Sequence, residues 1–193
     1  MNSASKKAIL VVSFGTSYEN TRKLTIEAIE HDIADAFPAC PTYRAWTSKM
    51  IIAKLKKRDG LTIHTVKEAL EQMLLDGITD VIVQPTHVIN GIENDQMKAD
   101  ALSFRDRFSS IVFGNPLLTT EEDNQAIVRV VADEFRDMDP DTALVLMGHG
   151  TEHYANTVYA ALDYRFKDTG HKNIFLGTVE AYPALDSLLR AAD

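Results

Sequence analysis

Residues 142–153, TALVLMGHGTEH, decide the fold class of this chain. The apolar run from Ala143 to Met147 is typical of a buried strand in a parallel sheet. It ends on a Gly-His-Gly sequence centred on His149. Open α/β sheets bind ligands just beyond the carboxyl ends of their strands, and glycine lets the backbone approach a ligand closely. We therefore expect His149 to lie at a functional edge, although a capped strand end with a surface imidazole explains the same pattern.

Similar apolar runs recur along the chain and alternate with segments of helical periodicity. The predicted strands are Ala8–Phe14, Thr42–Trp46, Asp80–Gln84, Ile111–Gly114, Ala143–Met147 and Ile174–Val179. The predicted helices are Asn20–Phe37, a helix from the Thr65–Glu68 capping box to Gly77, Asp95–Phe108, Glu121–Phe135 and Ala155–Phe166. This alternation predicts an α/β fold with parallel sheets flanked by helices.

Composition narrows the classes of partner. The net charge is −8 and no basic tail offsets it, which argues against nucleic acid. No apolar run approaches the length that spans a membrane, and we interpret the apolar N-terminal segment as a first strand rather than a signal peptide. The single cysteine, Cys40, cannot form an internal disulfide, which fits the cytoplasm.

The turn after the first strand, SFGTS at residues 13–17, is a candidate anion-binding turn. Ser13, Gly15, Thr16 and Ser17 could cradle carboxylates or phosphate ahead of a helix N-terminus. The turn matches neither the Walker loop nor the GxGxxG pattern, and a tight turn with a helix cap explains it equally well. Residues 11–32 weakly resemble residues 144–165, so two facing lobes would bring this turn and His149 to one cleft; any two strand–helix units look this similar.

Two further loops follow predicted strands. In PTHVINGIE, residues 85–93, His87 lies between strand and helix, and Glu93 lies where the helix begins. Glu93 is either a functional acid or a first-turn residue that the helix dipole favours, and His87 is either a ligand group or a buried, hydrogen-bonded histidine. Glu180 follows the last strand, where its carboxylate would lie near His149. The two side chains could then form a pair of metal ligands, or a base with its orienting group. Alternatively, Glu180 is a solvated residue at the start of a helix.

Basic residues gather in one segment of this acidic chain. They are Arg44, Lys49, Lys54, Lys56, Lys57 and Arg58. Such a cluster is either a solvated helix face or a patch that steers a polyanionic substrate.

Five motifs, in this order, resemble the anaerobic cobalt chelatase family of cobalamin biosynthesis, CbiK. They are VVSFGTS (11–17), RAWTSKMIIAKL (44–55), HVINGIE (87–93), VLMGHGT (145–151) and GTVEAYPALD (177–186). The resemblance implies two similar lobes, residues 1–119 and 120–193, with a tetrapyrrole cleft between them. It also implies insertion of Co²⁺ into sirohydrochlorin or precorrin-2 without an organic cofactor.

Roles follow from the same motifs. The resemblance implies that His149 binds the metal and takes pyrrole protons, that Glu180 is a metal ligand, and that Glu93 is an active-site acid. For the carboxylates of the tetrapyrrole we expect the SFGTS turn, Arg44, Lys49 and His87 to supply contacts.

One departure from the family pattern concerns the second metal-binding histidine, which family members carry after the YP-x-x-D helix. None of the six histidines of this chain stands there, so we expect an incomplete second lobe and a metal site with two protein ligands. We also expect the chain either to self-associate or to be marginally stable. Iron or nickel insertion into sirohydrochlorin, or tetrapyrrole and metal binding without catalysis, remain the alternatives.

Overall fold

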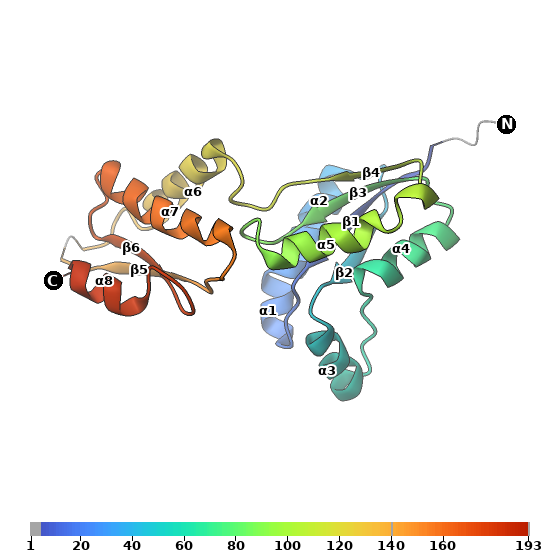
Figure 1. Ribbon diagram of the computed structural model, residues 1–193, viewed down its shortest axis with the longest axis horizontal. Helices are drawn as coiled ribbons and strands as arrows, with labels where there is room; N and C mark the ends of the chain where they lie inside the picture. Colours follow the sequence, from blue (N-terminus) through green and yellow to red (C-terminus); the bar gives the residue numbers. More distant parts are fainter. Residues whose placement is uncertain (1–4, 140, 193) are drawn as a thin grey trace. The chain divides into compact units, whose positions relative to one another are not determined.

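The computed structural model describes residues 5–139 and 141–192 and divides the chain into two compact units. Unit 1 comprises the chain up to Val88 together with residues 93–116, and unit 2 comprises residues 89–92 and the chain from Leu117 onward. Both units are built from parallel strands and flanking helices (Figure 1), which confirms the predicted α/β class.

Unit 1 contains a four-stranded parallel sheet in the order β2-β1-β3-β4. The strands are β1 (Lys7–Ser13), β2 (Thr42–Trp46), β3 (Asp80–Pro85) and β4 (Ser110–Phe113). Each lies within one residue of its predicted bounds, because short apolar runs between polar turns mark buried strands clearly. The carboxyl ends of β2, β1 and β3 are neighbours, so the loops that follow them share one edge of the sheet.

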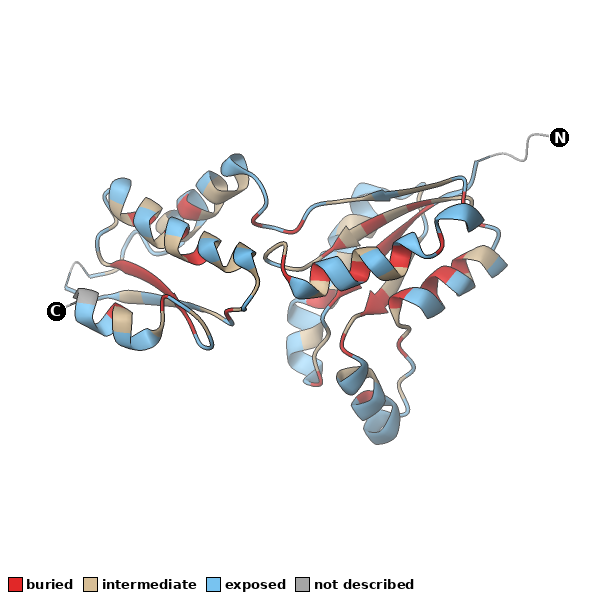
Figure 2. Ribbon diagram, in the orientation of Figure 1, coloured by how far each residue is buried: buried red, intermediate tan, exposed pale blue. Residues whose placement is uncertain are grey.

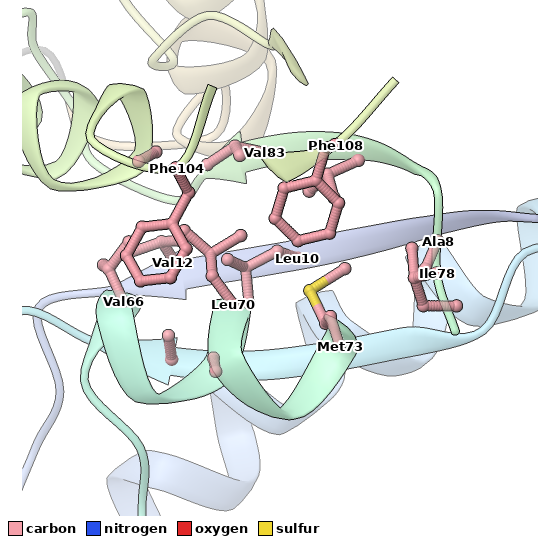
Figure 3. Close-up of a cluster of buried hydrophobic side chains, with 14 of the residues drawn as sticks. Ala8, Leu10, Val12, Val66, Leu70, Met73, Ile78, Val83, Phe104 and Phe108 are labelled. Carbon is pink, nitrogen blue, oxygen red and sulfur yellow. The ribbon is translucent and has the colours of Figure 1, made fainter. Parts of the chain in front are cut away.

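Helices cover both faces of this sheet. α4 (Val66–Leu75) and α5 (Ile92–Leu102) pack on one face, where their apolar side chains and those after α5 meet β1 and β3 (Figure 3). α2 (Ile26–Ala36) packs against the other face, beside α3 (Lys49–Asp59). Each fully buried side chain in these clusters stabilises the fold by about 1.5–3 kcal/mol relative to an exposed one.

The predicted helix Asn20–Phe37 is wrong as a single element. The structure has α1 (Glu19–Leu24) and α2, separated at Thr25 with φ −122° and ψ −76°. The Thr25 hydroxyl donates to the carbonyl oxygen of Thr21 at 2.7 Å, a local hydrogen bond that bends helices. The apolar periodicity of the sequence continues across this break, so the periodicity did not predict the break.

The predicted helix Asp95–Phe108 also differs from the structure. Its counterpart, α5, begins three residues earlier and ends at Leu102, and a separate 3₁₀ turn at Arg105–Arg107 follows. Phe104 and Phe108, on either side of that turn, are both buried in the core. Because Phe104 and Phe108 are four residues apart, their spacing in the sequence matches that of one helical face, and the helix was predicted too long.

Unit 2 contains two parallel strands, β5 (Leu144–Gly148) and β6 (Ile174–Thr178). α6 (Glu121–Glu134) and α7 (Thr157–Asp168) pack on one face, and α8 (Leu185–Ala192) packs against β6. A 3₁₀ turn, Tyr154–Asn156, precedes α7, so the predicted Ala155–Phe166 helix starts two residues later than expected.

The expectation that Ala143–Met147 is buried on both sides is wrong. Burial alternates along β5 (Figure 2), and the side chains of Val145 and Met147, which share one face of the strand, are 40% and 43% exposed. Among the described residues β5 pairs only with β6, so its other edge has no strand partner. None of the helices in the described part of the chain is long and apolar enough to cross a membrane.

Candidate functional site

In unit 2, His149 and Glu180 follow two neighbouring strands and lie side by side. Backbone pairing continues beyond the strands, since the amide of Val179 donates to Gly148 O at 3.0 Å and that of Glu180 to His149 O at 2.9 Å. The two side chains approach to 3.8 Å between Nδ1 of His149 and Oε2 of Glu180. The sheet register thus brings together the imidazole and the carboxylate that the sequence pairs.

The His149 ring is held in one orientation by its own loop. Nδ1 lies 3.0 Å from the carbonyl oxygen of Gly150. A carbonyl oxygen can only accept, so this hydrogen bond requires the proton on Nδ1, and a neutral imidazole in this tautomer carries its lone pair on Nε2. The His149 and Glu180 side chains are 77% and 65% exposed. Nε2 is therefore available to bind a divalent ion or to accept a proton, with a carboxylate beside the ring.

Glycines on either side of His149 allow the loops to approach closely. Gly150 has φ +86°, and a Cβ there would lie 2.9 Å from both Ala181 N and Thr178 Cβ. A Cβ at Gly148 would lie 2.5 Å from the Tyr159 ring. The Thr178 hydroxyl donates to Ala181 O at 2.6 Å and fixes the loop that carries Glu180. The glycines that the sequence analysis linked to ligand approach are required here by backbone packing.

Within the described residues, this pair is not part of a larger metal-binding cluster. Across residues 5–139 and 141–192, no group of three or more His, Cys, Asp or Glu side chains could hold a metal ion. His153, four residues after His149, accepts a hydrogen bond from the Ala155 amide at 3.1 Å on Nδ1 and so caps the following turn. This local contact gives His153 a structural role at the start of that turn.

In unit 1, the Ser13–Ser17 turn lies at the carboxyl edge of the sheet. Ser13 is buried, and its Oγ accepts a hydrogen bond from Oγ1 of Thr86, which follows β3, at 2.8 Å. Thr16 Oγ1 accepts from the Tyr18 amide at 3.3 Å. These hydroxyls hold the turn together, and Thr16 is the more accessible of the two.

Gly15 permits the sharpest part of this turn. Its φ is +102°, and a Cβ would lie 2.5 Å from Cε3 of Trp46. Trp46 is fully buried at the end of β2, so its indole cannot move aside freely. The turn is therefore packed directly on the aromatic ring, which the sequence analysis did not foresee.

His87 and Glu93 lie on the loop after β3 and at the start of α5. Both ring nitrogens of His87 are buried, and neither has a hydrogen-bond partner among the described residues. Burial lowers the pKa of His87, and the nearby Glu93 carboxylate opposes that effect. The imidazole is thus neutral at pH 7, with one donor and one acceptor unsatisfied. Buried polar groups normally have partners, so His87 is well placed to bond a bound molecule.

Arg44 lies away from the carboxyl edge of the sheet. It is the central residue of β2, where it pairs with Val11, and it forms a bidentate ion pair with Glu30 of α2, with Glu27 at 3.7 Å. These partners raise the pKa of Arg44, chiefly through the hydrogen bonds that its guanidinium donates to Glu30. Its charge is already neutralised locally. Lys49, by contrast, is the exposed first residue of α3, directly after β2.

Exposed apolar side chains at the same edge were missed from the sequence. Phe14, Tyr18, Met50 and Val88 follow β1, β2 and β3 and are exposed. Their position just after a strand could have identified them as candidate site residues. Ligand-binding residues follow the carboxyl ends of strands, and the polar residues of these loops were identified on that basis.

Comparison with known proteins agrees with these motifs. The family model described as cobalt chelatase (CbiK) matches residues 7–193. A sirohydrochlorin cobaltochelatase of Salmonella typhimurium is 38% identical over 184 residues, covering 95% of this chain and 69% of that protein. The sirohydrochlorin cobaltochelatase CbiKC of Nitratidesulfovibrio vulgaris is 31% identical over 191 residues, covering 95% of this chain and 65% of that protein. The chain thus spans about two thirds of the length of these relatives, and it belongs to the cobalt chelatase (CbiK) family.

Proposed function

We propose that this chain is a sirohydrochlorin cobaltochelatase, which inserts Co²⁺ as a substrate metal into sirohydrochlorin or its precorrin-2 form. Family membership and the names of both relatives support the reaction. The observation that carries the proposal is the His149–Glu180 pair at the carboxyl ends of β5 and β6. An imidazole nitrogen and a carboxylate are the two kinds of group that metal insertion needs.

Metal insertion requires the tetrapyrrole to lose two N–H protons and the ion to lose bound water. In the proposal, Nε2 of His149 binds the incoming ion and accepts a pyrrole proton, since a neutral imidazole does both near neutral pH. The Glu180 carboxylate is the second metal ligand. Glu93 acts as an acid or base for the pyrrole protons.

Substrate contacts are proposed for the carboxyl edge of unit 1. Thr16 and the backbone of the SFGTS turn would bind substrate carboxylates, while Ser13 and Ser17 hold the turn through their own hydrogen bonds and burial. The unpartnered ring nitrogens of His87 would bond a polar group of the bound tetrapyrrole. The exposed side chains of Phe14 and Tyr18 offer apolar contact to its macrocycle.

Two alternatives differ from this proposal in ways that experiment separates. Imidazole and carboxylate also suit Fe²⁺ and Ni²⁺, so the names of the relatives favour cobalt and the ligand types do not. Binding of tetrapyrrole or metal without catalysis is favoured by the two-residue ligand set in the described part of the chain.

The test is metal insertion followed by the absorption spectrum of sirohydrochlorin, with Co²⁺, Fe²⁺ and Ni²⁺ compared at equal concentration. We expect His149→Ala to lower the rate at least about 100-fold while circular dichroism shows an intact fold, because removing a general base costs about 10²–10⁴. His171→Ala, before β6 in the same unit, is the matched control and should retain the rate. Insertion at an unchanged rate by His149→Ala would refute its role, and tetrapyrrole binding without insertion by the unmutated chain would support the non-catalytic alternative.

A further inference from the structure

The outer face of α3 carries four exposed lysines: Lys49, Lys54, Lys56 and Lys57. The opposite face packs inward, with Leu55 fully buried in the cluster that contains Trp46, and with Ile51 and Ile52 against that cluster. This division follows helical periodicity, so the lysines point away from the core. We call these four residues the α3 lysine face.

Both ends of α3 are attached to the Ser13–Ser17 turn. At its start the Ser48 amide donates to Phe14 O at 3.2 Å, and at its end the Arg58 guanidinium donates to Ser17 O at 2.8 Å. The helix therefore stands beside the carboxyl edge of the unit 1 sheet, where substrate contacts are proposed. Its position is fixed by hydrogen bonds to the turn itself.

The charge of the α3 lysine face is not cancelled by ion pairs. None of its four lysines has an ion-pair partner within the described residues, whereas the neighbouring Arg58 pairs with Asp59 and is left out of the face for that reason. Lys56 acts on the carboxyl of Glu68, whose pKa it helps to lower, without forming an ion pair with it among the described residues. A chain with net charge −8 thus concentrates unpaired positive charge beside one loop.

We propose that the α3 lysine face attracts the carboxylates of the tetrapyrrole substrate and raises its rate of association. The inference rests on the proposed function, because it takes the polycarboxylate substrate from there, and on charge complementarity. A net-negative protein repels a polyanion at long range, and a local cationic surface beside the binding loops reverses that repulsion where the substrate arrives. The lysines act before chemistry, so they affect kcat/KM and leave kcat unchanged.

The experiment compares two triple variants of equal net charge. One is Lys54→Gln/Lys56→Gln/Lys57→Gln. Its control is Lys7→Gln/Lys98→Gln/Lys172→Gln, which removes the same charge from the amino end of β1, from α5 and from the segment before β6. The association rate of metal-free sirohydrochlorin is followed by its fluorescence in stopped flow, from low to high salt, and kcat/KM for cobalt insertion is measured in parallel.

For the α3 variant we expect association to slow by about tenfold at low ionic strength, within the range that electrostatic steering supplies. The difference from the unmutated chain should vanish near 1 M salt, where the screening length falls to about 3 Å. The control variant should change little. Lys54→Arg/Lys56→Arg/Lys57→Arg keeps the charge and should associate at the unmutated rate.

Each result decides the matter. An equal loss in the α3 variant and the control, or no loss in either, would overturn the proposal. If the unmutated chain fails to bind sirohydrochlorin, the proposed function falls together with this inference, whereas unchanged salt dependence with binding intact removes only the inference. Lys56 and Lys57 also lie in the last turn of α3, where cations stabilise a helix. If their loss unfolds the triple variant, Lys54→Gln, which leaves that turn intact, repeats the test against Lys98→Gln as its control.

Discussion

Replacing Gly15 with alanine tests the packing of the SFGTS turn on Trp46. Gly15 has φ +102°, and an alanine Cβ would lie 2.5 Å from Trp46 Cε3, closer than real Cβ contacts occur. Holding an L-residue in a left-handed conformation costs about 1–2 kcal/mol, and overpacking a core typically costs about 1–3 kcal/mol. Because the Trp46 side chain is fully buried, we expect both costs in full, about 2–5 kcal/mol of unfolding free energy.

Gly60→Ala is the matched control for this variant. Gly60 ends α3 with φ +67°, and its Cβ would have no atom within 4 Å, so alanine there meets conformational cost alone. The difference between the two variants therefore isolates the contact with Trp46, which we expect to be about 1–3 kcal/mol.

Urea unfolding followed by tryptophan emission measures that difference. Trp46 is the only tryptophan, so the signal reports on the turn and on unit 1. With a slope of about 1–3 kcal/mol per molar urea, the Gly15→Ala midpoint should fall about 1 M below that of Gly60→Ala. Equal midpoints would show that the turn does not pack on the indole as described.

Two further predictions concern carboxylates. Glu180→Gln should weaken Co²⁺ binding, since a neutral amide is a poor partner for a divalent ion, whereas Glu93→Gln should slow insertion with less effect on metal affinity. Calorimetric titration of Co²⁺ and the rate of insertion, measured for both variants, separate the two effects. An equal loss of metal affinity in both variants would remove the distinction. Hydrogen bonds from Ser110, Thr79 and Ser5 lower the pKa of Asp80 from 3.8 to about 2. Its folded pKa is depressed, so its stabilisation is present above pH 3.8 and is lost as pH falls towards 2. Asp80→Asn should therefore lower the melting temperature at neutral pH and lose this effect near pH 2, and a loss that is the same at both pH values would contradict the linkage.

Local sequence signals predicted most of the elements of this fold. Apolar runs located all six strands, and the Thr65–Glu68 capping box is present with both of its hydrogen bonds. The proximity of His149 and Glu180 was also predictable, because parallel neighbouring strands end at one edge.

Other features depended on contacts that no local pattern contains. Arg44 pairs with Glu30, fourteen residues earlier, so its charge is neutralised by a helix on the face of the sheet. The exposure of Val145 and Met147 depends on whether other elements cover that face of β5, which the apolar run does not encode. The buried contact between Gly15 and Trp46 joins the ends of two strands and was likewise invisible in either segment alone.

The backbone hydrogen bonds that continue past β5 and β6 have a consequence for metal choice. They place residues 149 and 180 on adjacent backbone segments at the spacing of paired strands, about 4.8 Å. Opening or closing this spacing would break the hydrogen bond from the Glu180 amide to His149 O, so the backbone does not adjust to the size of an ion. The distance between the imidazole nitrogen and the carboxylate oxygen is set instead by the length and rotation of two mostly exposed side chains. Ions of slightly different radius can therefore be accommodated by side-chain rotation alone, while the sheet keeps the backbone spacing constant.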